Sequence, residues 1–148
     1  MNKIKRFVLD ILKKDTNYKS LIPYTVDYKD SKVPGSFGGV CTYSLFKSKI
    51  YIKEKYINDV GLLRHEITHA KQFGRLWIIH TTLYLLSSTY RLFMELEAYR
   101  EQVKAYNYKK GLDYSWIIDA LYNKYNLEMS KESIQIYADY MFYDIIKR

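Results

Sequence analysis

The sequence predicts an α+β fold: a mainly helical domain with a small antiparallel β-hairpin immediately before a helix that carries two histidines. Three observations support this class. Apolar residues recur at the three- and four-residue spacing of amphipathic helices near both ends of the chain and through its centre. Short runs of β-branched and aromatic residues, bounded by Gly, Pro and Ser, occur between positions 21 and 52. With 148 residues, 48% of them hydrophobic, the chain can bury one core, so we expect a single domain over residues 1–148.

In the N-terminal third of the chain, the sequence pattern predicts one helix, one strand, a loop and a hairpin. Lys3–Lys14 has apolar residues at helical spacing and lysines on the other face, which is typical of an amphipathic helix in a packing role. Its apolar residues are Ile4, Phe7, Val8, Ile11 and Leu12. Leu21–Tyr28 predicts a strand, and the Pro- and Gly-rich segment Asp30–Gly39 predicts a loop. Val40–Tyr43 and Ile50–Ile52, separated by Ser and Lys residues, predict an antiparallel hairpin.

Two helices are expected in the centre of the chain. Asn58 or Asp59 can cap the first, which runs for about four turns with an apolar stripe toward the core, and Gly74 is a plausible residue to end it. The segment Leu76–Tyr90 is apolar on most sides. We therefore expect a second helix there, buried at the centre of the core.

Three further helices are expected in the rest of the chain. They are Leu92–Lys109, ended by Gly111; a helix from Asp113 or Ser115 through Tyr125; and a helix from Ser130 and Ser133 to Ile145. Many of the 17 tyrosines lie in or near these segments. At helical spacing they are more typical of packing than of a platform on which nucleic-acid bases stack.

Composition bears on partners and location. The 24 Lys and Arg against 16 Asp and Glu give a formal charge of +8, which favours acidic partners such as nucleic acid, anionic polymers or an acidic protein, but which also fits a chain simply rich in Lys, Tyr, Asn and Ile. Cys41 is the only cysteine, so no intrachain disulfide can form. No secretory signal is recognisable, and the most apolar stretch, residues 76–86, is too short to span a bilayer. We therefore expect a cytoplasmic protein without a membrane span.

The five residues His65-Glu66-Ile67-Thr68-His69 carry the strongest chemical signal. On a helix, residues four apart point the same way, so both imidazoles can bind one Zn²⁺ at about 2.0–2.1 Å. Glu66, one step round the helix, can reach a water at that ion. This pattern is the helical signature of a zinc metallopeptidase, although a surface pair of histidines on an amphipathic helix can produce the same spacing.

A catalytic zinc ion usually has a third protein ligand. The metzincin pattern is excluded, because Gln72 and Arg75 stand where its glycine and histidine belong. His80 lies on the helix expected to be most buried, where a hydrogen-bonded core histidine is the more usual role. Glu95 and Glu97 are the stronger candidates, and because they differ by about 200° around a helix only one of them can face the metal.

With Glu95-Leu96-Glu97-Ala98-Tyr99 after the His-Glu-x-x-His helix, the chain resembles gluzincins. The similarity is to minigluzincins and to compact peptidase domains encoded by bacteriophages and contractile injection systems, and it covers roughly Val40 to Gln102. It implies a zincin-like domain with Glu95 as the third ligand, and virion association if the chain is phage-encoded. A Gln at the position of Gln72 recurs in such domains. Tyr99 departs from the pattern, because many relatives have an acidic residue there that holds a zinc-binding histidine, and a phenol oxygen can accept the same hydrogen bond.

The resulting hypothesis is peptide-bond hydrolysis with one Zn²⁺ per chain, held by His65, His69 and Glu95, and with Glu66 as general base. We expect a tyrosine from the C-terminal helices as a further oxyanion donor, without a choice among the 17.

A peptide or protein substrate would lie extended against the hairpin residues Val40, Cys41, Thr42 and Tyr43, since strand addition supplies main-chain hydrogen bonds. The hairpin could equally be an ordinary surface feature. The competing hypothesis is a catalytically silent, zinc-stabilised module whose basic surface binds nucleic acid or an assembly partner. No recognisable nucleic-acid motif supports it, and Glu66 argues against it, because a structural metal site needs no base.

Overall fold

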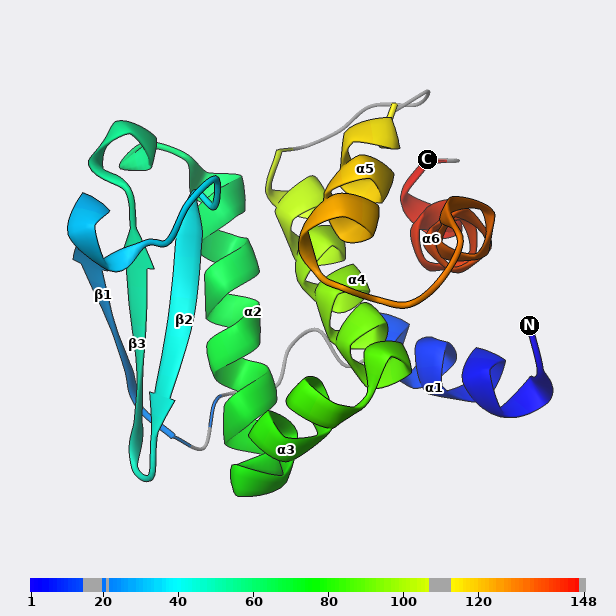
Figure 1. Cartoon of the computed structure of the whole chain (residues 1–148), viewed down its shortest axis with the longest axis horizontal. Coiled ribbons are helices and arrows are strands. Elements are labelled where there is room, and N and C mark those ends of the chain that lie inside the picture. The colour runs from blue at the N-terminus through cyan, green and yellow to red at the C-terminus, as the bar shows by residue number, and fades with distance from the viewer. Residues whose placement is uncertain (15–19, 21, 107–112, 147–148) are drawn as a thin grey trace.

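The computed structural model of the chain describes residues 1–14, 20, 22–106 and 113–146. Within these ranges the chain forms six α-helices, two short 3-10 helices and a three-stranded sheet, which confirms the predicted α+β class. Figure 1 shows the sheet at one side of the molecule with α2 packed against it, and α4, α5 and α6 beyond α2. None of the described helices is long and apolar enough to cross a membrane.

The sheet contains the predicted hairpin and one further strand. Its strands are β1 (Tyr24–Tyr28), β2 (Gly39–Ser44) and β3 (Lys47–Ile52), in the order β1-β3-β2. β2 and β3 are antiparallel as predicted, with the turn shortened to Leu45 and Phe46. β1 confirms the predicted strand from Tyr24 onward and pairs parallel to β3, whereas Leu21 lies outside the described residues. The 3-10 helices η1 (Asp30–Lys32) and η2 (Glu54–Tyr56) follow β1 and β3, and β2 keeps a free edge.

Helix α2 (Val60–Leu76) begins as predicted and ends later than predicted. The Asp59 carboxylate accepts a hydrogen bond from the Leu62 N–H at 2.8 Å and so caps the helix. The prediction that Gly74 ends the helix is wrong, because Gly74 remains helical and buried. The helix ends instead at Trp77, whose φ of 49° turns the chain. The Trp77 indole N–H donates to the carbonyl of Leu45 at 2.6 Å, which holds this turn against the hairpin.

The predicted helix over Leu76–Tyr90 is wrong in both extent and position. This segment of the chain instead forms α3 (Ile78–Leu86) and the start of α4 (Ser88–Ala105). Ser87 is extended and its hydroxyl accepts a hydrogen bond from the Tyr90 N–H, so it caps α4, which begins at Ser88, four residues before the predicted start at Leu92. In α3 only His80 is buried, whereas its leucines and isoleucines are largely exposed. The helix at the centre of the core is therefore α4.

The main core lies around α4. Leu92, Leu96 and Val103 of α4 are fully buried against residues of α5 (Ser115–Lys124) and α6 (Lys131–Ile146), two helices whose prediction is confirmed. A smaller core between the sheet and α2 contains Ile50, Ile52 and Ala70. The predicted end of the α4 helix at Lys109 and Gly111 lies outside the described residues.

Helix α1 (Lys3–Lys14) has the predicted bounds but turns a different face to the core. Leu9 is fully buried, whereas Ile4, Phe7 and Ile11 of the predicted stripe are exposed. Hydrogen bonds from its basic side chains to α6 hold the helix in this orientation. Lys5 Nζ donates to the Tyr137 hydroxyl at 3.0 Å, and the Arg6 side chain donates to the hydroxyl of Tyr140.

The contact between the start of α2 and the end of α4 gives a test of this packing. A Cβ on Gly61 would lie 2.2 Å from the Tyr106 ring, whose hydroxyl donates to the Asp59 carboxylate at 2.7 Å. Helix propensity alone favours Gly→Ala by up to about 1 kcal/mol. We nevertheless expect Gly61→Ala to lower the free energy of unfolding by about 1 kcal/mol, because the displaced tyrosine loses a hydrogen bond to a charged carboxylate, which contributes about 1.5–3 kcal/mol.

Urea denaturation measures this effect, and the matched control is Gly61→Ala in a Tyr106→Ala background. Without the ring, the same substitution should be neutral or stabilising. Stabilisation by Gly61→Ala in the otherwise unchanged chain would contradict the packing described.

Candidate metal centre

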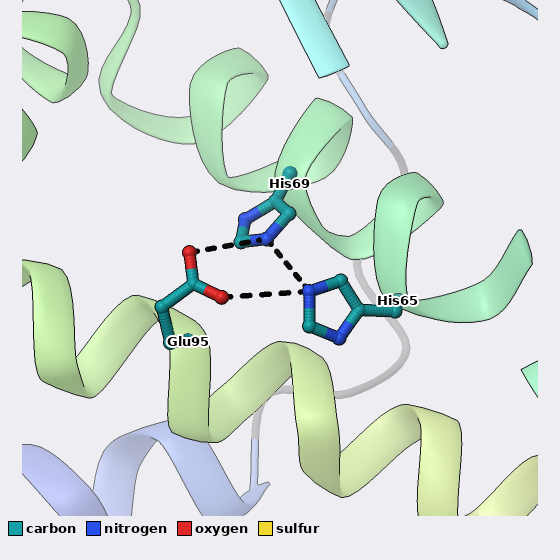
Figure 2. A group of neighbouring side chains, drawn as sticks. All are labelled: His65, His69 and Glu95. Carbon is teal, nitrogen blue, oxygen red and sulfur yellow. Dashed lines mark hydrogen bonds and ion pairs between the residues drawn. The ribbon is translucent and has the colours of Figure 1, made fainter. Parts of the chain in front are cut away.

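Helix α2 places the two motif histidines side by side in the interior. His65 and His69 are one helical turn apart, and both are buried. Their Nε2 atoms lie 3.1 Å apart (Figure 2). Two imidazole nitrogens with their lone pairs aimed at the same small volume are the usual start of a metal site.

Glu95 completes the group from α4. Its Oε2 lies 3.4 Å from His65 Nε2 and its Oε1 lies 3.4 Å from His69 Nε2. One possible ligand atom from each of the three residues lies within 4.8 Å of the others. Oε2 of Glu95 is buried without a hydrogen-bond partner among the described residues, an arrangement that is costly unless a cation supplies the missing interaction. Two imidazoles and a carboxylate are a donor set that zinc accepts, so the residues fit the predicted ion.

Charge holds the three residues together. Burial alone favours a neutral carboxyl group, but the neighbouring His69 and the contacts with both imidazoles outweigh it and keep the pKa of Glu95 well below its usual range. Burial alone also lowers the pKa of His69, yet the charge of Glu95 overcomes it and raises the pKa to about 9. The site is therefore arranged around an anionic carboxylate and attracts positive charge, whether a proton or a metal ion.

Glu97, the alternative third ligand, points to a different partner. Its Oε2 accepts hydrogen bonds at 2.9 Å from Arg75 and from the Gln72 amide. The buried charge of Glu97 is thus balanced by a guanidinium group. Of the two candidate carboxylates on α4, the one that the fold brings to the imidazoles is Glu95.

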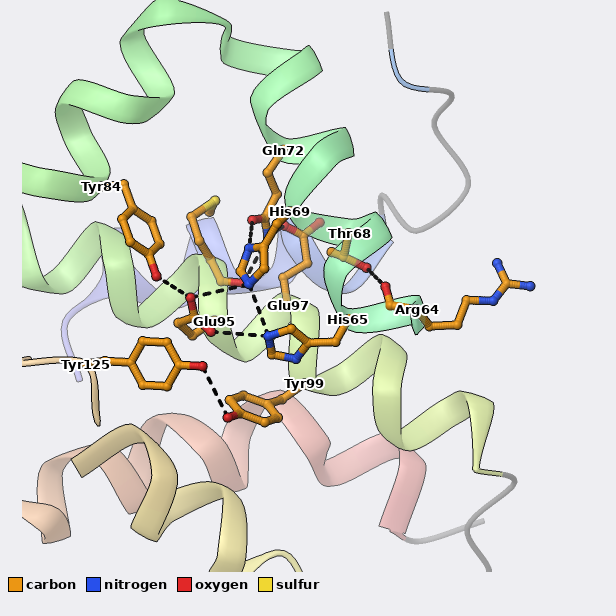
Figure 3. A network of polar contacts seen from close by, with 11 residues as sticks. Arg64, His65, Thr68, His69, Gln72, Tyr84, Glu95, Glu97, Tyr99 and Tyr125 are labelled. Carbon is orange, nitrogen blue, oxygen red and sulfur yellow. Dashed lines mark hydrogen bonds and ion pairs between the residues drawn. The ribbon is translucent and has the colours of Figure 1, made fainter. Parts of the chain in front are cut away.

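Gln72 orients one of the imidazoles (Figure 3). Its NH₂ group donates to the Met94 carbonyl and to Glu97, both at 2.9 Å, which fixes the direction of the amide. Its Oε1 must therefore accept the hydrogen bond, of 2.9 Å, from Nδ1 of His69. Nε2 of His69 is the nitrogen left to bind a metal. The sequence marked Gln72 only as a recurrent residue, and this role depends on contacts between helices.

Tyr99 contacts His65 in a way that differs from the prediction. The rings meet edge to face with centroids 4.5 Å apart, and Nδ1 of His65 has no hydrogen-bond partner among the described residues. The Tyr99 hydroxyl instead lies 3.3 Å from that of Tyr125. A phenol is longer than a carboxylate, so its oxygen reaches past the imidazole and the contact is one of ring packing.

Two residues of α3 border the site, and only one of them was considered from the sequence. Tyr84 donates a hydrogen bond to Oε1 of Glu95. No sequence signal distinguished it from the other tyrosines. His80 is fully buried and lies 2.8 Å from the Tyr90 hydroxyl, outside the group of possible ligands, and burial lowers its pKa to about 4. It has the position of the core histidine that the sequence predicts.

Glu66 lies beside the histidines against the first residue of β2. A Cβ on Gly39 would come within 2.9 Å of Oε1 of Glu66, so only glycine allows this approach of strand and carboxylate. Burial raises the pKa of Glu66, which makes its carboxylate a stronger base.

Two adjoining pockets, of about 450 and 490 Å³, meet at His65 and Glu66. A bridge separates their outer parts: Phe37, from the loop after β1, meets Tyr125 edge to face with ring centroids 5.9 Å apart. Beside this contact, Lys124 Nζ donates to the Ser36 carbonyl at 3.4 Å. The two pockets therefore lie next to each other between the sheet and the C-terminal helices, and His65, Glu66 and the Phe37–Tyr125 contact line both of them.

The free edge of β2 borders these pockets. Val40, Cys41 and Tyr43 line the first pocket. Thr42 does not, because its side chain is exposed and its hydroxyl donates to the Lys49 carbonyl. Lys53 N–H donates to the carbonyl of residue 38, so by antiparallel alternation the even-numbered residues of β2 bond to β3. The N–H and C=O groups of residues 39, 41 and 43 consequently point to the open edge.

No family model matches the chain, and no significantly similar protein was found among the curated proteins or the solved structures. Three buried ligand atoms, one adjacent carboxylate and an open cleft are the features that a function has to explain.

The opposite surroundings of the two α4 carboxylates give a matched test of metal binding. We expect the chain to bind one Zn²⁺, and Glu95→Gln to weaken that binding by at least about 100-fold, because the amide brings no charge. Glu97→Gln makes the same chemical change two residues away and should keep about one ion per chain.

Equilibrium dialysis against Zn²⁺ with a competing chelator measures the affinities, and circular dichroism checks that each variant is folded. Equal losses in the two variants, or a larger loss in Glu97→Gln, would contradict the assignment of Glu95.

Proposed function

We propose that the protein is a zinc-dependent metallopeptidase that hydrolyses peptide bonds. The observation that carries the proposal is the convergence of His65, His69 and Glu95 within 4.8 Å, with Glu66 beside them at the meeting point of two pockets. When bound there, zinc would supply Lewis acidity: it would lower the pKa of a water toward about 7 and polarise the scissile carbonyl.

The ligand set favours a catalytic site over a structural one. Structural zinc sites usually have four protein ligands, most often cysteines and histidines. The group found among the described residues has three members, one of them a carboxylate, and it opens on a cleft. Cys41, the only cysteine, lines that pocket and is not a member of the group.

Glu66 would act as the base. Its burial beside the histidines raises its pKa, so that it can accept a proton from the attacking water and later deliver it to the leaving nitrogen. Gly39 brings β2 close enough to hold the carboxylate in place. The water oxygen forms the new bond to the carbonyl carbon, the C–N bond breaks, and the proton moves through Glu66 to the amine.

The substrate would be an extended peptide added to β2. The open main-chain groups of residues 39, 41 and 43 would pair with the peptide backbone, which gives affinity without requiring a particular side-chain sequence. The pockets on the two sides of His65 and Glu66 would take side chains on the two sides of the scissile bond. A chain entering both pockets would have to pass the Phe37–Tyr125 bridge.

Tyr125 is our choice for the further oxyanion donor. It follows the last residue of α5 and lines both pockets, and its ring packs edge to face against the ring of Tyr99, which lies beside His65. Burial raises its pKa far above the usual value, so its hydroxyl keeps its proton and can donate a hydrogen bond. Tyr84 would serve instead to hold Glu95 in place.

The direct test replaces the base while keeping the ligands. Glu66→Gln should lower peptide hydrolysis by at least about 1,000-fold, because the amide cannot accept the proton, and should leave zinc stoichiometry near one. Digestion of a mixed peptide library, read by mass spectrometry, measures the activity whatever sequence the protein prefers to cleave.

If the protein is a silent, metal-stabilised module, neither the unchanged chain nor Glu66→Gln will cleave any peptide. If Glu66→Gln is fully active, Glu66 is not the general base. Glu132→Gln is the activity control, since it makes the same chemical change at an exposed residue in the first turn of α6.

A further inference from the structure

Helix α3 presents its apolar face to the outside. Its inner side holds His80 and Tyr84, whereas Ile79, Leu83 and Leu86, at helical spacing on the other side, are 61%, 37% and 82% exposed. A soluble helix normally buries such a stripe. The apolar row is thus the outer surface of an element whose inner surface serves the metal centre.

The tip of the hairpin extends this surface. Leu45 and Phe46 are 57% and 75% exposed, and the Trp77 indole, itself 43% exposed, is hydrogen-bonded to the Leu45 carbonyl at 2.6 Å. We define the apolar end as Leu45, Phe46, Trp77, Ile79, Leu83 and Leu86. Figure 1 shows the hairpin tip, the end of α2 and α3 together along the lower edge of the molecule. Large exposed apolar patches on soluble domains mark sites of association.

The charge around the apolar end is of one sign. Residues 39–50 and 76–90, which supply all six side chains of the apolar end, contain no Asp or Glu, while Lys47 and Lys49 stand at the start of β3 beside the hairpin tip. Lys47 follows Phe46 directly at the hairpin tip. A second copy of the chain would bring the same positive charge against itself in a two-fold contact, which disfavours a dimer through this surface. A surface that is anionic and also has an apolar interior would be complementary to both the positive charge and the exposed apolar side chains.

We propose that the apolar end docks peripherally on an anionic lipid bilayer. Apolar side chains would enter the boundary between headgroups and acyl chains, Trp77 would sit at the interface, and the basic residues would contact anionic headgroups. Helix α1 carries a similar combination, since Ile4 and Phe7 are exposed next to Lys3, Lys5 and Arg6. Neither element spans the bilayer.

Docking would set the substrate class of the proposed peptidase, and this step rests on the proposed function. Tyr84 and Leu85 of α3 border Glu95 and the first pocket, so the metal centre would lie about one helix diameter, roughly 10 Å, from the membrane surface. Peptide segments held close to a bilayer are the substrates that reach such a site.

Vesicle binding tests the docking without any need for activity. With phosphatidylcholine vesicles containing about 30% phosphatidylglycerol, the chain should co-sediment at low salt and bind more weakly at high salt or to pure phosphatidylcholine. The variant Phe46→Ser, Ile79→Ser, Leu86→Ser should bind at least about tenfold more weakly.

The matched control is Ile57→Ser, Val60→Ser, Ile136→Ser, which removes three apolar side chains that are also more than half exposed, two of them at the opposite end of α2 from Trp77. It should bind like the unchanged chain, as should Glu66→Gln, whose activity is irrelevant here. No co-sedimentation of the unchanged chain, or equal loss in the two triple variants, would overturn the proposal.

The fluorescence of Trp77 can be measured separately, because the chain has only two tryptophans and the other can be replaced. In a Trp116→Phe background its emission should shift to shorter wavelength on anionic vesicles and be quenched by brominated lipids. An unchanged spectrum together with concentration-dependent dimerisation, lost in the Phe46, Ile79 and Leu86 variant, would show that the surface binds a second copy and would refute membrane docking.

Discussion

The structure depends on one electrostatic constraint: a carboxylate and two imidazoles share a buried volume between α2 and α4. Glu95 is 1% exposed and meets Nε2 of both histidines at 3.4 Å. Three polar groups in such a place are destabilising unless their charges compensate one another or a cation joins them. The spacing of α2 from α4 is therefore set by this contact as well as by apolar packing, and a metal ion bound there would join the two halves of the molecule.

The rest of the site can be understood as support for that contact. On one side, Arg75 neutralises Glu97, which helps to hold the Gln72 amide that orients His69. On the other side, the Tyr84 hydroxyl holds Glu95 from α3. This second contact explains why α3 turns its polar residues inward and its leucines outward, an orientation that leaves the apolar end of the molecule open to a bilayer. The same helix would thus link the place where the protein docks to the place where it acts.

The sequence was sufficient for parts that depend on local pattern. The helix with His65, Glu66 and His69, its Asp59 cap and the β2–β3 hairpin all follow from spacing and turn residues. Periodicity could not tell which way an apolar stripe faces, so α3 was expected in the core, and Ser87 was not recognised as a cap. The resemblance to gluzincins favours Glu95 over Glu97, but the contact that holds Glu97 away from the histidines could not be read from the sequence, because its partner, Arg75, lies on another helix. The role of Tyr84 required the fold for the same reason.

The most direct test is the coordination shell in a crystal structure of the zinc-loaded protein. We predict one ion with Nε2 of His65 and His69 at about 2.0–2.1 Å and a carboxylate oxygen of Glu95 at about 2.0–2.2 Å, while Glu97 stays on Arg75. Zinc bound through Glu97, or at a place that leaves both imidazoles without metal, would contradict this arrangement.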